Sequence, residues 1–379
     1  MKILIVTHYF LPHVGGIEIV AYNQAKELVK RGHEVTIISS RIGNEPEREV
    51  MDGIRIIRVK SLNIFEEKYG IPYPVYSPKI LFTLNKEVKK ADIVHLHECF
   101  YLPSFVASIF SVLNKKPYII MQHVEPINTG RIIVTAIQNL FYYTYGKFIL
   151  DKSKKILVCN DKAGKSLNRP EKTIFLPNAV DTKIFKPRTE RQIKVLRKKY
   201  DLPINKKIVL FAGRFVPKKG FDKVYKAKSA DYLILFVGGG IIPPEIKKDR
   251  DVEFLPFLYQ KELSEVYALS DIFILPSVNE GFPLTILEAM ACGLPIITTD
   301  HPGYDLYLNR KFVELIKPEV EVIRSSIKKV LSNSNKLKEM SSYSLKEVKN
   351  RFSWEKNVNN LLNIYEQALK EHASKNKQK

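Results

Sequence analysis

Short apolar runs alternate with amphipathic stretches along the whole chain. Residues 2–7 form the first apolar run, a glycine pair then opens an amphipathic stretch that reaches Lys30, and residues 34–39 form the second run. An apolar run of this length is typical of a parallel strand buried on both faces, and a period of 3.6 residues is typical of a helix. Gly32, just after the amphipathic stretch, is a favoured helix stop. Residues 1–40 therefore predict a strand–helix–strand unit.

The same pattern continues in two blocks. In the first block the further predicted strands are residues 54–59, 91–96, 117–122, 155–159 and 173–177. In the second block they are residues 208–212, 232–237, 252–255, 271–275 and 295–299. Strands that alternate with helices predict an α/β fold, and a chain of 379 residues is long enough for two domains. We therefore expect two Rossmann-like domains, residues 1–187 and 188–379.

Residues 279–295 carry two carboxylates around the start of a short apolar helix. Pro283 suits the first turn, where its missing N–H is not needed, and Gly293 followed by Pro295 ends the helix. The free main-chain N–H groups of residues 281–285 predict an anion site at the positive end of this helix.

The second of these carboxylates, Glu288, lies among apolar residues two turns into the predicted helix. A carboxylate in such surroundings needs hydrogen-bond donors or a raised pKa, and a ribose diol next to a phosphate would supply the donors. The alternative is an exposed Glu288 on a surface helix, with Glu280 at the end of an exposed loop. Because buried strands are predicted on both sides, at 271–276 and 294–299, we favour a nucleotide site at the carboxyl ends of parallel strands.

Four segments together resemble one enzyme family. Residues 279–295 resemble the E-x7-E signature of the retaining glycosyltransferases of family 4, the group 1 glycosyltransferases. Three others resemble that family's segments in the same order: residues 175–187 (FLPNAVD, then Phe185 and Pro187), residues 211–220 (FAGRFVPKKG) and residues 352–355 (FSWE). Ala179 and Lys218 depart from the family pattern, which has Gly and an acid at these positions.

The resemblance implies the GT-B architecture, in which two Rossmann-like domains face a central cleft. Residues 1–187 would bind the acceptor and residues 188–379 the nucleotide sugar, and the last helix, about 353–370, would cross back to pack on the first domain. The glycine pair Gly15-Gly16 would lie in a loop that faces the cleft. It lacks the G-x-G-x-x-G pattern, so a nicotinamide site is not predicted.

The resemblance also implies roles for individual residues. Arg214 and Lys219 would bind the diphosphate, Glu288 the ribose, and Glu280 the donor sugar, without being assigned as a nucleophile. His123, which follows a predicted strand, matches the family's cleft histidine and would position the sugar and the acceptor hydroxyl. The predicted catalytic residues are His123 and Glu280, and the predicted donor-binding residues are Gly15, Gly16, Arg214, Lys219, Gly281, Phe282, Pro283, Leu284 and Glu288.

No metal or other cofactor is expected beside the donor, which would be a UDP- or GDP-hexose. His95 and His97 alternate along one strand face with Glu98 beside them, but a distant further ligand is not identifiable. Residues 249–251 mimic a DxD metal motif of a different glycosyltransferase fold, and they lie in a charged loop. Basic side chains and the N-terminus of a helix would already stabilise the negative charge of the diphosphate, so a metal ion is not needed for this purpose.

Charge and composition indicate which partners this protein binds and where in the cell it acts. A net charge of +21 calls for an anionic partner, yet the sequence holds no nucleic-acid-binding module. An anionic membrane surface and a lipid-linked or saccharide acceptor fit better, and residues 64–82 form an apolar loop suited to a bilayer. The three cysteines stand singly, the N-terminal residues predict a strand and not a signal peptide, and the sequence has no membrane-spanning run. We therefore expect a cytoplasmic enzyme, peripheral on the cytoplasmic face of the membrane.

The predicted function is the retaining transfer of a hexose from a UDP- or GDP-sugar to a hydroxyl acceptor. Two alternatives stay open at this point. A nucleotide-sugar epimerase of GT-B type would act on the donor alone, and a non-catalytic protein would only bind it.

Overall fold

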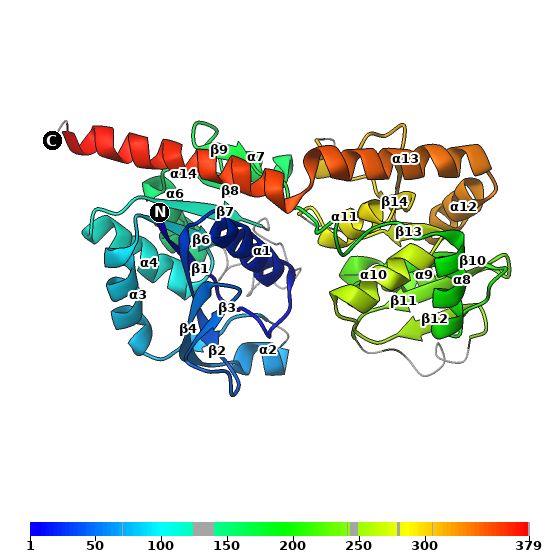
Figure 1. The fold of residues 1–379 in the computed structure, drawn as a ribbon, viewed down its shortest axis with the longest axis horizontal. Coiled ribbons are helices and arrows are strands. Elements are labelled where there is room, and N and C mark those ends of the chain that lie inside the picture. The colour runs from blue at the N-terminus through cyan, green and yellow to red at the C-terminus, as the bar shows by residue number, and fades with distance from the viewer. Residues whose placement is uncertain are drawn as a thin grey trace. The chain divides into compact units, whose positions relative to one another are not determined.

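In a computed structural model, the chain forms two compact units, each built around a mainly parallel sheet (Figure 1). The structure describes residues 1–69, 71–123, 140–240, 242, 249–278, 281–304 and 306–377. Unit 1 comprises residues 1–177 and 354–379, and unit 2 comprises residues 178–353. The predicted α/β class with two Rossmann-like units is confirmed.

Unit 1 contains a nine-stranded sheet in the order β3-β4-β2-β1-β6-β7-β8-β9, with β5 paired to β4. Its strands are β1 (Lys2–Val6), β2 (Glu34–Arg41), β3 (Arg48–Met51), β4 (Ile54–Leu62), β5 (Val75–Tyr76), β6 (Ile93–His97), β7 (Tyr118–Gln122), β8 (Ile156–Val158) and β9 (Thr173–Phe175). All neighbouring strands are parallel except β3 and β5, which are antiparallel to β4. The carboxyl ends of the parallel strands therefore lie along one edge.

Helices cover both faces of this sheet (Figure 1). The described helices of unit 1 are α1 (Gly16–Lys30), α2 (Ile64–Tyr69), α3 (Lys79–Lys90), α4 (Leu102–Leu113), the π-helical turn η1 (Tyr142–Gly146), α6 (Lys147–Lys152), α7 (Asp161–Ser166) and α14 (Trp354–Lys377). Apolar residues of α3 and α4 pack on one face. On the other face, α14 contacts β6 through a hydrogen bond between Tyr365 and His95. α14 also contacts α1, because the side-chain amide of Gln24 donates a hydrogen bond to Asn357. Residues 64–82 are thus α2, β5 and the start of α3, and not the single loop that the sequence suggested.

Unit 2 contains a six-stranded parallel sheet in the order β12-β11-β10-β13-β14-β15. Its strands are β10 (Lys207–Ala212), β11 (Tyr232–Val237), β12 (Val252–Leu255), β13 (Ile272–Leu275), β14 (Ile296–Thr299) and β15 (Glu314–Ile316). Its described helices are α8 (Glu190–Lys199), the 3-10 turn η2 (Pro217–Lys219), α9 (Phe221–Lys226), α10 (Gln260–Leu269), α11 (Leu284–Ala291), the 3-10 turn η4 (Pro302–Tyr304), α12 (Val320–Leu331) and α13 (Ser334–Arg351). β10 and β13 are neighbours, so the segments that follow them begin side by side.

The division between the units falls between Pro177 and Asn178, earlier than the predicted boundary after residue 187. Main-chain contacts explain the difference, because the N–H of Val180 donates to the carbonyl of Phe352 at 2.8 Å. Phe185 is buried and its ring centroid lies 5.8 Å from that of Tyr267 on α10. Residues 178–187 therefore pack as part of unit 2.

Candidate functional site

The loop after β10 carries the two basic residues predicted for the diphosphate. Arg214 is exposed near the carboxyl end of β10, and Lys219 ends the η2 turn. Gly220 follows in the left-handed region with φ of 76°, and a Cβ at this position would lie 2.6 Å from the carbonyl oxygen of Pro276. The N–H of Val278 donates to the carbonyl of Lys218 at 2.9 Å. This loop is therefore clamped against the chain that leaves β13 and leads to α11.

The start of α11 is held by the core of unit 2. The side chain of Phe282 is buried, and its ring stacks on that of Tyr307 with centroids 3.9 Å apart. The amide of Asn178 donates to the carbonyl oxygen of Phe282 at 2.8 Å. Phe282 thus offers only its main chain to a ligand. Asn178 and Tyr307 were missed as supports, because their contacts join residues that are distant in sequence.

The remaining residues of this turn follow Phe282 directly. Pro283 is the N-cap of α11 and Leu284 its first residue, while Gly281 precedes them. The first N–H groups of a helix have no partner within the helix, so this turn remains the predicted anion site. Glu280 lies outside the described residues.

Glu288 is buried in α11, with 7% of its surface exposed. Its Oε2 accepts a hydrogen bond of 3.0 Å from the hydroxyl of Tyr267 on α10. Burial raises the pKa of the Glu288 carboxyl to about 7, although the hydrogen bond from Tyr267 acts in the opposite direction. Among the described residues this buried carboxylate has one donor, so it can accept further hydrogen bonds from a polar ligand at the start of the helix.

The glycine pair of unit 1 lies at the carboxyl end of β1, where Gly15 is the N-cap of α1 and Gly16 its first residue. A Cβ at Gly15 would lie 2.5 Å from Oε2 of the buried Glu18. Glu18 in turn contacts Nδ1 of His13 at 2.9 Å, and Nε2 of His13 lies 3.3 Å from Glu66 on α2. Burial lowers the pKa of His13, but the two carboxylates outweigh this effect and the net shift is upward.

His123 follows β7 at the same edge of the unit 1 sheet and is buried. Its Nε2 lies 3.0 Å from Nδ1 of His97 at the end of β6. Burial lowers the pKa of His123 to about 3, so this imidazole is neutral near pH 7. Among the described residues, no three His, Cys, Asp or Glu side chains form a group that could hold a metal ion.

The predicted site residues thus form two sets. Arg214, Lys219 and the turn at residues 281–284 follow the neighbouring strands β10 and β13 of unit 2, with Glu288 on the helix behind them. Gly15, Gly16 and His123 follow β1 and β7 of unit 1.

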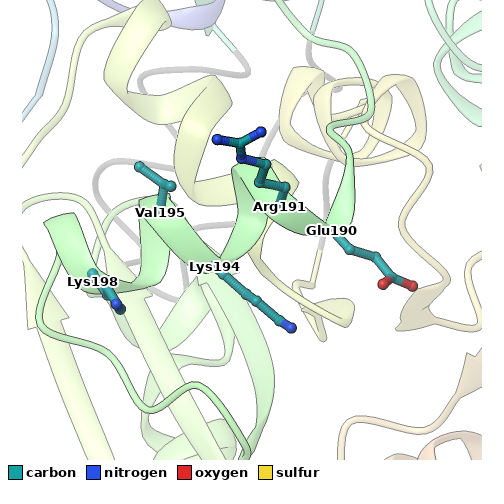
Figure 2. A pocket seen from close by; sticks show the side chains of 5 residues that line it. All are labelled: Glu190, Arg191, Lys194, Val195 and Lys198. Atoms are coloured by element: carbon teal, nitrogen blue, oxygen red, sulfur yellow. The ribbon is translucent and has the colours of Figure 1, made fainter.

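One further surface feature does not involve the predicted residues. Figure 2 shows a pocket on α8, lined by Glu190, Arg191, Lys194, Val195 and Lys198. All five residues come from one helix, and the lining is mostly basic. Within the part of the chain that the structure describes, no helix is long and apolar enough to cross a membrane.

Comparisons with known proteins identify the family. Residues 14–184 match the family model described as Glycosyltransferase Family 4, and residues 192–347 match that described as Glycosyl transferases group 1. A glycosyltransferase of Haemophilus influenzae, itself uncharacterized, is 30% identical over 78% of this chain and 80% of its own length. A GDP-mannose-dependent alpha-mannosyltransferase of Mycobacterium tuberculosis is 26% identical over 80% of each chain.

Solved structures support the same fold. The Anabaena protein HepE, in complex with UDP and glucose, superposes with a TM-score of 0.75 over 99% of this chain and 100% of its own, at 16% identity. At this identity the likeness shows the fold alone, and it confirms the predicted GT-B class. The chain therefore belongs to the group 1 glycosyltransferases of family 4 and is a glycosyltransferase of GT-B fold.

Proposed function

We propose that this glycosyltransferase moves a hexose from a UDP- or GDP-sugar to a hydroxyl acceptor, with retention of the anomeric configuration. The observation that carries the proposal is the buried Glu288, which among the described residues accepts one hydrogen bond, from Tyr267, and lies on α11, the helix that follows β13. Donor-binding residues would be Gly15, Gly16, Arg214, Lys219, Gly281, Phe282, Pro283, Leu284 and Glu288.

Each part of unit 2 would serve a different part of the donor. Arg214 and Lys219, with the N–H groups at the start of α11, would stabilise the negative charge on the diphosphate as the glycosidic bond opens. Glu288 would accept hydrogen bonds from the ribose hydroxyls. This supply of positive charge makes a metal ion unnecessary for the leaving group, so we propose transfer without a metal.

The transfer breaks the bond between the anomeric carbon and the diphosphate oxygen and forms one to the acceptor oxygen. The acceptor hydroxyl gives its proton to the departing diphosphate oxygen, and the diphosphate leaves as part of the nucleoside diphosphate. In the proposed retaining reaction the new bond forms on the face that the diphosphate leaves. Glu280 would contact the donor sugar, and His123 would position a sugar or acceptor hydroxyl.

Similar proteins support both UDP and GDP as the nucleotide of the donor. The mycobacterial relative is GDP-mannose-dependent by name, and the Anabaena protein was solved with UDP and glucose. We therefore propose a hexose donor of one of these two nucleotide classes.

We further propose a lipid-linked or glycan acceptor at an anionic membrane surface. Support comes from the net charge of +21 and from exposed apolar side chains on α2 and α3, among them Phe65 and Phe82, the latter 77% exposed. Two aromatic residues of the same stretch are less exposed, since Tyr76 is buried and Tyr73 is half-buried, with its ring centroid 5.8 Å from that of Tyr101. The apolar surface proposed for the membrane therefore consists of Leu62, Ile64, Phe65, Ile71, Val75, Leu81 and Phe82.

The test is a product assay with UDP- and GDP-hexoses, membrane lipid extracts and simple saccharide acceptors. We expect nucleotide release and a new glycoside whose anomeric proton coupling shows the configuration of the donor. An inverted product would overturn the retaining mechanism. Conversion of the donor without any acceptor would indicate an epimerase, and binding without turnover a non-catalytic protein.

A further inference from the structure

Three buried histidines form a row on the face of the unit 1 sheet that α14 covers. His95 and His97 lie on β6 with ring centroids 4.6 Å apart, and the ring of His123 after β7 lies 5.2 Å from that of His97. Among the described residues, the rings of this row make two hydrogen bonds: one joins Nδ1 of His97 and Nε2 of His123 at 3.0 Å, and the other joins Nδ1 of His95 and the hydroxyl of Tyr365 at 2.8 Å. His97 is thus the side chain in direct contact with the ring of His123 within this row.

All three imidazoles are neutral at ordinary pH. Burial lowers the pKa of His95 and of His123 to about 3 and that of His97 well below its usual value. A neutral imidazole carries one N–H donor and one lone pair. The bond between His97 and His123 must therefore run in one of two directions, and each direction fixes the tautomers of both rings.

The other ring nitrogen of His97 decides between these directions. Nε2 of His97 is buried and has no hydrogen-bond partner among the described residues. If His123 donated, His97 would carry its proton on this nitrogen and bury an unpaired N–H. If His97 donates, only a lone pair is left unpaired, and unpaired buried acceptors are more common than unpaired buried N–H groups. His97 is therefore the donor, and His123 carries its proton on Nδ1.

The main chain of His123 is held by the residue next to His97. Glu98 is buried, and its Oε1 accepts a hydrogen bond of 2.5 Å from the N–H of His123. The φ of Glu98 is 67°, in the left-handed region that residues other than glycine rarely adopt. Two consecutive residues at the end of β6 thus hold the main chain and the ring of His123.

We propose that His97 is a positioning residue, which donates from Nδ1 to Nε2 of His123 and so fixes His123 as the tautomer with a proton on Nδ1. The Nδ1–H of His123 is then its one ring donor for an oxygen of the donor sugar or the acceptor. This inference rests on the proposed function, in which His123 contacts one of these substrates.

The first test reads the tautomer directly, without an assay of activity. Long-range 15N–1H spectra of protein labelled with 15N-histidine distinguish a proton on Nδ1 from one on Nε2, and the spectrum of His123→Ala identifies the signals of His123 among the eight histidines. We expect Nδ1–H for His123, with a change in its tautomer balance in His97→Leu. A proton on Nε2 of His123, or signals of His123 that are unchanged in His97→Leu, would overturn the inference.

The second test separates positioning from stability. His97→Leu removes the donor, whereas His97→Asn keeps an N–H close to the position of Nδ1. His95→Leu is the matched control, because His95 is an equally buried imidazole on the same strand but bonds to Tyr365. We expect kcat to fall roughly 10- to 100-fold in His97→Leu, as for a misplaced positioning group. His97→Asn should recover most of this loss, and His95→Leu should lower the melting temperature with kcat little changed.

His123→Ala distinguishes the failure of this inference from the failure of the proposed function. If His123→Ala retains full activity, the proposed role of His123 fails and the positioning role of His97 fails with it. If His123→Ala is impaired while His97→Leu and His95→Leu lose kcat equally, His97 acts only as a packing residue and the proposed function still stands.

Discussion

Glu288 combines two demands on one carboxyl group, namely burial in the core of unit 2 and the proposed contact with a ribose. Its pKa of about 7 lies above the value of 4.5 for an exposed glutamate. Because the folded protein favours the protonated carboxyl, this group stabilises the folded state fully below pH 4.5, and the stabilisation is lost as the pH rises through about 7. The ionised carboxylate costs the free protein roughly 3 kcal/mol at higher pH.

This cost leads to a prediction for Glu288→Gln. The amide has no charge to bury, so the free energy of unfolding of the variant, relative to the wild type, should rise between pH 4.5 and pH 8. Nucleotide affinity should fall in the same variant, because the amide accepts fewer hydrogen bonds from a ribose diol. Chemical denaturation at pH 5 and pH 8 and nucleotide titrations measure the two effects. A stability difference that is the same at both pH values would contradict the burial argument.

At the scale of elements, the donor loop depends on one glycine. In Gly220→Ala the φ of 76° becomes strained, and the added Cβ meets the carbonyl of Pro276. We expect these two effects to lower the free energy of unfolding by about 2 kcal/mol. Nucleotide binding should also weaken, because Lys219 moves with the loop. Thermal unfolding and nucleotide titration check both. Gly239→Ala is the control for stability, because its Cβ would meet nothing within 4 Å; equal destabilisation of the two variants would contradict the clamp.

The central elements could be predicted from the sequence because they are long and apolar. β11 is buried throughout and β10 is buried except for Lys207, and their apolar runs have no helical period. The strands that were missed in unit 1, β3 and β5, pair at or beside the sheet edge. β3 has only intermediate and exposed residues, and β5 has two residues, so their pairing depends on tertiary contacts.

The same distinction applies to the candidate site. The motif around Glu288 and the Arg214–Lys219 loop were identified because their residues are close in sequence. The residues that support the site, Asn178 and His97, were not identified, because their hydrogen bonds join distant parts of the chain. The bond from Asn178 to Phe282 spans 104 residues, and the bond from His97 to His123 spans 26 residues. Such contacts follow from the order of strands in the sheet, which local patterns do not determine.

At the scale of the whole molecule, the charge of +21 and the apolar surface that includes Phe65 and Phe82 predict reversible membrane binding. Burial of a phenylalanine contributes about 1.5–3 kcal/mol, so Phe65→Ser with Phe82→Ser should weaken binding to vesicles at least about tenfold. Flotation with phosphatidylglycerol vesicles at low and high salt measures this. Val195→Ser, which removes an exposed apolar side chain from α8 of unit 2, should float like the wild type. Failure of the wild-type protein to float at low salt would rule out the membrane contact.

The central claim is that unit 2 binds a nucleoside diphosphate through Lys219 and Glu288. Isothermal titration calorimetry with UDP and with GDP tests it most directly, because no acceptor is needed. We predict that the wild type binds one nucleotide, and that Lys219→Ala and Glu288→Ala each weaken binding roughly 10- to 100-fold, as expected for a lost charge-assisted hydrogen bond. Lys226→Ala, on the exposed side of α9, should bind like the wild type. Absence of binding to both nucleotides, or equal affinity in all three variants, would contradict the proposed donor site.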